Sequence, residues 1–140
     1  MLISIFLQLG FRPFFLAAFV FGALSMLLWM GIYTFDLNIQ PAYPATLWHG
    51  HEMIFGYALA AAAGFLLTAV KNWTGVQTAQ GAPLLFLLLA WLFARLFSLD
   101  LLLISPYFLV VSDLLFNIVL CYMIVSPVIK SKQSLILFFI

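Results

Sequence analysis

Charged side chains and cysteine are scarce in this sequence. Only 6% of the 140 residues are Asp, Glu, Lys or Arg, and Cys121 is the one cysteine. A single cysteine excludes an internal disulfide and a Cys-x-x-Cys redox or zinc site within the chain. The five basic residues form no patch with interleaved aromatic side chains, so nucleic acid is not an expected partner.

Hydrophobic residues stand where charges would be in a soluble protein. They make up 67% of the chain, whereas a soluble domain is about half apolar and about a quarter charged. A soluble core of this size could not bury so much apolar surface. The composition therefore predicts an integral membrane protein whose main partner is the lipid bilayer.

Apolar runs predict the membrane helices. A helix needs about 20 residues to cross a bilayer, and the runs of that length cover residues 13–33, 46–70, 83–104 and 106–125. Pro13 suits a first helical turn, and Pro127 is expected to close the fourth helix. A short apolar run, 134–140, follows. The expected fold is an all-α, polytopic transmembrane bundle of four spanning helices plus the start of a fifth, a fragment of a larger protein.

The basic residues predict the orientation of the helices in the membrane. The loops that would lie on one side carry four of them, Arg12, Lys71, Lys130 and Lys132. The opposite loops, residues 36–45 and the turn near Ser105, carry none. By the positive-inside rule, the N-terminus is expected to be cytoplasmic.

Both histidines lie in the stretch Trp48–Tyr57, WHGHEMIFGY, where Glu52 follows them. On a regular helix beginning near an N-cap at Thr46, His49 and His51 differ by about 200° and do not bind one metal from one face. Two interpretations stay open. The histidines could be an interfacial pair near the lipid headgroups, or one could ligate haem or another metal while Glu52 orients a ring.

Small residues follow His49 along the same predicted helix face, at Gly56, Ala60 and Gly64, with Thr68 continuing the row. Small residues four apart let a second helix approach closely in a membrane. They could equally leave room for a flat macrocycle below a histidine ligand. Helix packing is the favoured interpretation.

Two charges, Arg95 and Asp113, interrupt the later apolar runs. In antiparallel helices both would lie on the order of 10 Å from the outer boundary, at 1.5 Å per residue, so an ion pair is possible. Arg95 could instead neutralise a cofactor carboxylate such as a haem propionate. Asp113 and Asn117 share a face, and with Arg95 they could line a polar path in a transporter.

Three stretches together resemble one family, the NnrS proteins. They are LGFRPFFL at 9–16, WHGHEMIFGY at 48–57 and GFLLTAVKNWTG at 64–75, with looser agreement in LLAWLFARL at 88–96. The resemblance implies a bacterial inner-membrane protein of about twelve helices, containing haem and copper. It also implies a role in withstanding nitric oxide, alongside denitrification genes, without an established enzymatic activity. Lys71 departs from the family pattern, which has proline there.

The resemblance places the candidate site at Arg12, His49, His51 and Glu52, to which the charge argument adds Arg95. His49 and His51 are the candidate metal ligands, and either could ligate haem iron. Haem and copper are the expected cofactors, but the motif does not assign which residue binds which. Nitric oxide is an expected ligand of the bound cofactor. Further ligands are expected from C-terminal helices or from another membrane subunit. The alternatives are a transporter or permease-like fragment and an inert truncated product.

Overall fold

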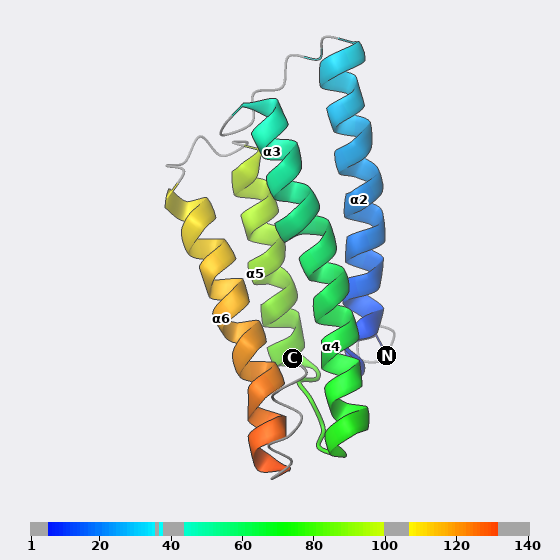
Figure 1. The fold of residues 1–140 in the computed structure, drawn as a ribbon, viewed down its shortest axis with the longest axis vertical. Coiled ribbons are helices and arrows are strands. Elements are labelled where there is room, and N and C mark those ends of the chain that lie inside the picture. The colour runs from blue at the N-terminus through cyan, green and yellow to red at the C-terminus, as the bar shows by residue number, and fades with distance from the viewer. Residues whose placement is uncertain (1–5, 36, 38–43, 100–106, 132–140) are drawn as a thin grey trace.

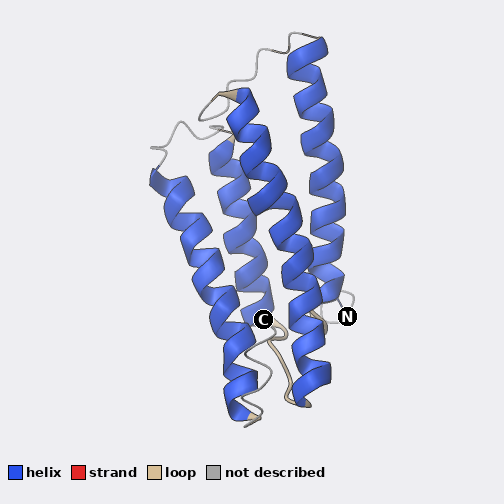
Figure 2. Cartoon of the chain, viewed as in Figure 1, coloured by secondary structure: helices blue, strands red, loops and turns tan. Residues whose placement is uncertain are grey.

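A computed structural model describes residues 6–35, 37, 44–99 and 107–131 of the chain. Within these residues every regular element is a helix (Figure 2), which confirms the all-α class. The predicted run 134–140 and the turn near Ser105 lie outside the described residues.

The chain passes up and down through a bundle (Figure 1). Its elements are α2 (Phe11–Thr34), α3 (Ala45–His51), η1 (Glu52–Ala58), α4 (Leu59–Thr74), α5 (Ala82–Ser98) and α6 (Tyr107–Lys130). α3, η1 and α4 follow one another directly and form one rod of 30 residues. η1 is a π-helix, and the others are α-helices.

Among the described residues, three helices are long and apolar enough to cross a membrane. They are Phe11–Thr34, Ala45–Thr74 and Tyr107–Lys130. α5 is apolar but has 17 residues, about 25 Å of helix against a hydrocarbon core of about 30 Å. The predicted helix over residues 83–104 is this shorter apolar helix within the described residues, and residues 100–104 lie outside them. The protein is a helical membrane bundle.

The helices begin close to the predicted positions, with different residues at their starts. α2 begins at Phe11, so Pro13 is its third residue. The rod begins at Ala45, and its N-cap residue, Pro44, makes no side-chain cap hydrogen bond. The prediction of Thr46 as N-cap is therefore wrong. In both places the helix begins without a side-chain cap hydrogen bond.

Two helices extend beyond their predicted ends. α4 continues past residue 70 to Thr74, where Gly75 adopts a positive φ of 69° and ends the helix. Pro127 lies inside α6, which continues to Lys130, so the prediction that this proline closes the helix is wrong. Proline removes one backbone N–H donor and its ring crowds the carbonyl four residues earlier, and membrane helices tolerate this when neighbouring groups support the chain.

The start of α2 and the ends of α4 and α6 lie at one end of the bundle (Figure 1). This end carries Arg12, Lys71 and Lys130, and we call it the basic end. The opposite end carries α3 with both histidines, and we call it the histidine end. These three basic residues, expected in loops, lie in terminal turns of helices, and they share one end as the sequence predicted. That this end faces the cytoplasm stays a prediction.

The apolar core lies mainly toward the basic end, where α2, α4, α5 and α6 meet. Its buried members include Phe14, Leu67, Val70, Leu84, Leu87, Leu120 and Val128. Outward-facing side chains are also large and apolar, with Phe19 exposed over 75% of its surface and Ile118 over 66%. An apolar exterior of this kind matches a lipid environment.

Candidate functional site: a buried ion network beside a π-helix

The rod that carries the histidines changes helix type directly after them. α3 ends at His51, and the π-helix η1 runs from Glu52 to Ala58 before α4 begins. π-helical turns are rare and occur frequently at functional sites. The wider turn rotates the side chains that follow it, along α4, relative to a regular α-helix that continues from α3.

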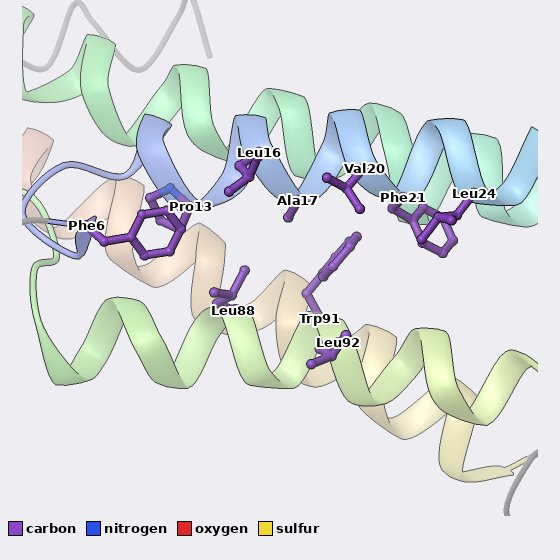
Figure 3. A pocket seen from close by; sticks show the side chains of 10 residues that line it. All are labelled: Phe6, Pro13, Leu16, Ala17, Val20, Phe21, Leu24, Leu88, Trp91 and Leu92. Atoms are coloured by element: carbon purple, nitrogen blue, oxygen red, sulfur yellow. The ribbon is translucent and has the colours of Figure 1, made fainter. Parts of the chain in front are cut away.

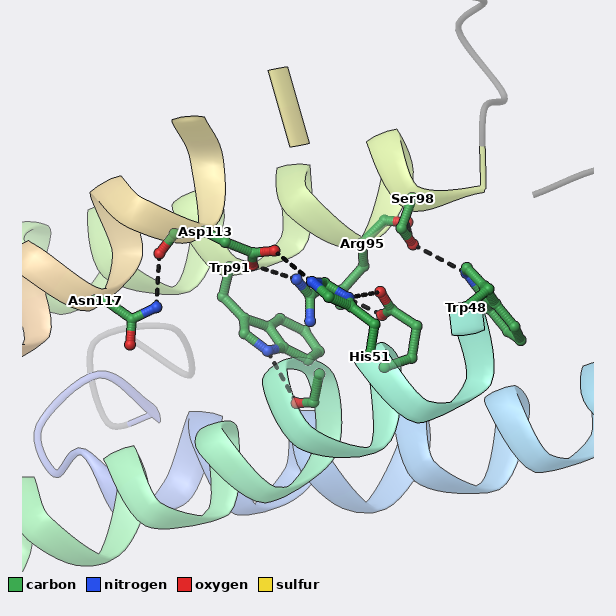
Figure 4. Close-up of polar contacts among 9 residues, drawn as sticks. Trp48, His51, Trp91, Arg95, Ser98, Asp113 and Asn117 are labelled. Carbon is green, nitrogen blue, oxygen red and sulfur yellow. Dashed lines mark hydrogen bonds and ion pairs between the residues drawn. The ribbon is translucent and has the colours of Figure 1, made fainter. Parts of the chain in front are cut away.

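Arg95 lies at the centre of a network of charged side chains that joins three elements (Figure 4). Its Nη2 donates a hydrogen bond to Asp113 Oδ1 on α6. Its Nε lies 3.3 Å from Glu52 Oε2 on η1, an ion pair without hydrogen-bond alignment. Arg95 is 2% exposed and Glu52 is fully buried. The predicted Arg95–Asp113 pair is thus confirmed, and Glu52 is its additional partner.

His51 closes the network from the other side. Its Nδ1 lies 3.0 Å from Glu52 Oε1, and its Nε2 lies 3.2 Å from Asp113 Oδ2. The ring also stacks on Phe55, with 4.6 Å between centroids. Both ring nitrogens of His51 therefore face carboxylates in this structure. Buried charges are costly unless they are paired, and here each carboxylate contacts both Arg95 and His51.

Two tryptophans fix the backbone around Arg95. Trp91 Nε1 donates to the carbonyl oxygen of Gly56 in the π-helix, at 3.0 Å. Trp48 Nε1 donates to Ser98 Oγ at 3.2 Å, and Ser98 Oγ donates to the Arg95 carbonyl at 2.9 Å. These bonds join the rod to α5 on either side of Arg95 along the helix (Figure 4). They also satisfy indole N–H groups that would be costly to bury without a partner.

His49 points to a different neighbour from His51. Its ring stacks on Trp29 of α2, with centroids 4.4 Å apart and 18° between the planes. His49 Nδ1 and Trp29 Nε1 are both buried, and neither has a hydrogen-bond partner among the described residues. The prediction that the two histidines face different sides agrees with these contacts. Glu52 contacts the ring of His51 and not that of His49.

The row of small residues is occupied by helix packing. A Cβ atom on Gly56 would lie 2.3 Å from the Phe21 ring and 3.1 Å from Arg95 Nη1. A Cβ atom on Gly64 would lie 3.1 Å from Phe14 Cβ. α2 and α5 therefore fill the space that a macrocycle would need. Of the two interpretations of this row, the structure supports helix packing.

Arg12 lies apart from the ion network. It is in the first turn of α2, and its guanidinium carbon lies 5.9 Å from the centre of the Phe11 ring. Phe11 packs against Gly64, which is twelve residues along the rod from Glu52, or about 18 Å of helix. The structure thus brings together His51, Glu52 and Arg95, sets His49 beside Trp29, and leaves Arg12 at the other end.

An open groove of about 380 Å³ adjoins the network between η1 and α6. Its walls are apolar, and its polar groups belong to His51, Asp113 and Asn117. Asn117 Nδ2 donates to the Asp113 carbonyl at 2.8 Å. In the part of the chain that the structure describes, no group of three or more His, Cys, Asp or Glu side chains is arranged to hold a metal ion.

Sequence reasoning missed the tryptophan contacts and the Glu52–Arg95 ion pair. A signal for the first was present, because an indole N–H within an apolar run needs an acceptor. Neither Trp48 nor Trp91 shows its acceptor in the local sequence, since Ser98 and Gly56 lie 50 and 35 residues away.

These features define a class: a polytopic helical membrane protein with a buried ion network around a π-helix. The model of the family described as NnrS protein matches residues 5–140. The chain therefore belongs to the NnrS family, as the three sequence stretches indicated. No curated protein and no solved structure matches the chain.

Proposed function

We propose that this chain holds a haem or copper cofactor at the histidine end and serves the bacterial response to nitric oxide. The observation that supports this proposal is His49, whose buried Nδ1 has no hydrogen-bond partner among the described residues. A neutral imidazole nitrogen is the group through which histidine ligates haem iron or copper. His49 therefore has a ring nitrogen that is suited to ligate a metal.

The proposal gives the neighbouring side chains different roles. His49 is the metal ligand, and stacking on Trp29 fixes the plane of its ring. His51 faces two carboxylates, so we place it in the ion network rather than on the metal. Arg95 joins this network to α5 and holds the histidine-bearing turn in place. When bound, the metal centre would supply redox chemistry and a position for a small ligand such as nitric oxide.

The described residues supply one candidate ligand and not a complete cofactor site. The row of small residues is filled by Phe21 and Phe14, so it offers no slot for haem. We therefore propose that further helices or another membrane subunit supply the remaining wall and ligands. The proposal assigns no cofactor contact to Arg12. We also propose that the protein lies in the bacterial inner membrane, with the basic end facing the cytoplasm.

The test is a reduced-minus-oxidised visible spectrum, with metal analysis, on the protein purified from bacterial membranes together with any subunit that copurifies. The wild type is expected to contain haem or copper. His49→Ala is expected to lose most of it, whereas the matched variant His51→Ala is expected to retain more. A colourless, metal-free wild type would contradict the cofactor proposal. If only His51→Ala lost its haem or copper, the assignment of His49 as the metal ligand would be contradicted.

One feature favours the transporter alternative, which is the open groove containing Asp113 and Asn117. It predicts a colourless protein and a cargo flux into vesicles that is lost in Asp113→Asn. Arg95, which the alternative also requires, is 2% exposed and engaged with two carboxylates. We therefore prefer the cofactor proposal.

A further inference from the structure

The π-helix divides the rod into two halves, α3 and α4, which are held by different contacts. In α3, His49 stacks on Trp29 of α2. In α4, Gly64 packs against Phe14 near the other end of α2. Each half therefore meets α2 through its own residues, and the helix type between the halves determines how one is rotated relative to the other.

The spacing of the backbone hydrogen bonds widens within the π-helix. The N–H of Leu59 donates to the carbonyl of Ile54, five residues earlier, whereas a regular α-helix joins residues four apart. A turn that is closed over five residues holds one residue more than an α-helical turn. The rod therefore contains about one residue more between its two halves than a regular helix with the same rotation.

Trp91 of α5 holds the π-helix from outside the rod. Its Nε1 donates to the carbonyl oxygen of Gly56 at 3.0 Å (Figure 4), and its side chain is buried. The carbonyls of a regular α-helix point along the axis to the N–H four residues on. A widened turn tilts carbonyls outward, where a side-chain donor can reach them. The Trp91 bond therefore favours the π-helical form of residues 52–58 over the α-helical form.

Phe21 of α2 supports the same point of the rod. Its ring meets the ring of Trp91 edge to face, with 5.5 Å between centroids, and the two side chains lie between α2 and α5 (Figure 3). The Phe21 ring also fills the space where a Cβ atom on Gly56 would lie. The π-helix is therefore held between α2 and α5 at Gly56.

The ion network holds the start of the π-helix less completely than its charges suggest. Nε and Nη1 of Arg95, Oε2 of Glu52 and Oδ2 of Asp113 are buried without a hydrogen bond to any described residue. Buried polar groups that a network leaves unsatisfied cost free energy and weaken its hold on one geometry. The rotation of α3 therefore depends on the Trp91 bond as well as on the network.

We infer that the Trp91 N–H latches the rod in its π-helical form, and that loss of this bond turns α3 by about one residue, or about 100°. When residues 52–58 become a regular α-helix and α4 stays in place, Gly50 moves to the position of His49 beside Trp29. Trp91 is thus a positioning residue for the histidine turn. This inference goes beyond the cofactor proposal, because the rotation can be measured without a metal.

The rotation is measured by pulsed electron paramagnetic resonance as the distance between spin labels at Gly50→Cys and Leu24→Cys. The purified protein carries Cys121→Ser, because Cys121 is an exposed free thiol. Both labelled positions are exposed, and a Cβ atom on Gly50 meets nothing within 4 Å. With Trp91 present we expect one distance. Trp91→Phe keeps an aromatic ring and removes the N–H, and we expect a second population displaced by several ångströms.

Thr78→Val is the matched control. Thr78 Oγ1 is also buried and also donates to a carbonyl of the rod, that of Leu67 in α4, so this variant loses a comparable hydrogen bond away from the π-helix. It should keep the single wild-type distance. The same second population in Thr78→Val would mean that any lost bond loosens α3, and this result would overturn the assignment to Trp91.

A one-residue deletion separates a latch from a general loss of stability. Removal of the exposed Ile54 lets the rod form a regular α-helix with both halves in their present places. Trp91→Phe combined with this deletion should therefore return to the single wild-type distance, whereas a protein that Trp91→Phe had only weakened would become worse. Circular dichroism establishes that each variant is folded.

Two results would overturn the inference directly: an unchanged distance in Trp91→Phe, and a failure of the deletion to restore the wild-type distance. If Trp91→Phe does not fold, the deletion of Ile54 in the presence of Trp91 decides. It should keep the wild-type distance, because a regular helix one residue shorter has the same rotation between its ends. A displaced label in this variant would show that the π-helix does not hold an extra residue.

Discussion

Toward the basic end, α2, α4, α5 and α6 meet through apolar side chains such as Phe14, Leu67 and Leu87. Toward the histidine end, the rod meets α5 and α6 through Glu52, Arg95 and other polar groups. Both regions are buried, but the helices contact one another through close apolar packing in the first and through ion pairs in the second. The two kinds of contact constrain the helices differently.

Lipid tails are as apolar as leucine, so apolar contact in a membrane favours neither a partner nor a register except through packing. An ion network is directional and requires each member at a given position. Arg95 reaches Glu52 and Asp113 only when α5, α6 and the rod have one relative height and rotation. The network therefore fixes the arrangement of helices that presents His49, while the apolar half supplies close packing.

Removal of the central charge should have the largest effect. Arg95→Met leaves Glu52 and Asp113 buried without the cation, and we expect the free energy of unfolding to fall by about 3–5 kcal/mol. Denaturant titration in detergent micelles measures the change. Lys130→Met, a similar change at an exposed helix end, is the control. An equally small loss in both variants would show that the network does not contribute to stability.

A cavity in the apolar half should have the next largest effect. Leu67 is fully buried, so Leu67→Ala should lower the free energy of unfolding by about 2–5 kcal/mol. Leu114→Ala, at a position 55% exposed, should change it little. The comparison with Arg95→Met also has a second readout, because only the charge variant should reduce the cofactor content. If Leu67→Ala reduces the cofactor content as strongly as Arg95→Met, the cofactor does not depend on the ion network more than on the apolar core.

An added methyl group at the π-helix should have an intermediate effect. The new Cβ in Gly56→Ala would meet Phe21 at 2.3 Å and Arg95 Nη1 at 3.1 Å, and overpacking of this kind costs about 1–3 kcal/mol. Gly50→Ala meets nothing within 4 Å and serves as the control. Thermal unfolding of the two variants gives the comparison. A Gly56→Ala protein as stable as the control would mean that the contact with Phe21 relaxes freely.

Loss of a peripheral hydrogen bond should have the smallest effect. Asn117 donates to the backbone carbonyl of Asp113, and Asn117→Leu should change the free energy of unfolding by no more than about 0.5–1.5 kcal/mol. Cofactor content should stay at the wild-type level, as in Asn72→Leu at an exposed position. A large loss of cofactor or of cargo flux in Asn117→Leu alone would assign the groove a functional role.

Several parts of the site could be predicted from local spacing. The opposite directions of His49 and His51 follow from two residues of helix, and the Arg95–Asp113 pair follows from equal depth in adjacent helices. The partner of Glu52 could not be predicted in this way. A regular helix projects Glu52 toward the side of His49, but its ion pair with Arg95 depends on how α5 packs against the rod. Nothing in the local pattern of apolar residues marks where a π-helix begins.

Composition and periodicity were enough to establish a helical membrane protein, because apolar content and run length act through the solvent and not through particular partners. They were also enough to place most helices to within a few residues. The partners of the polar side chains depended on the fold. Trp29 meets His49, and Trp48 meets Ser98, only after α2, α3 and α5 take one relative rotation and height. That arrangement is a property of all the contacts together, so no single stretch of sequence contains it.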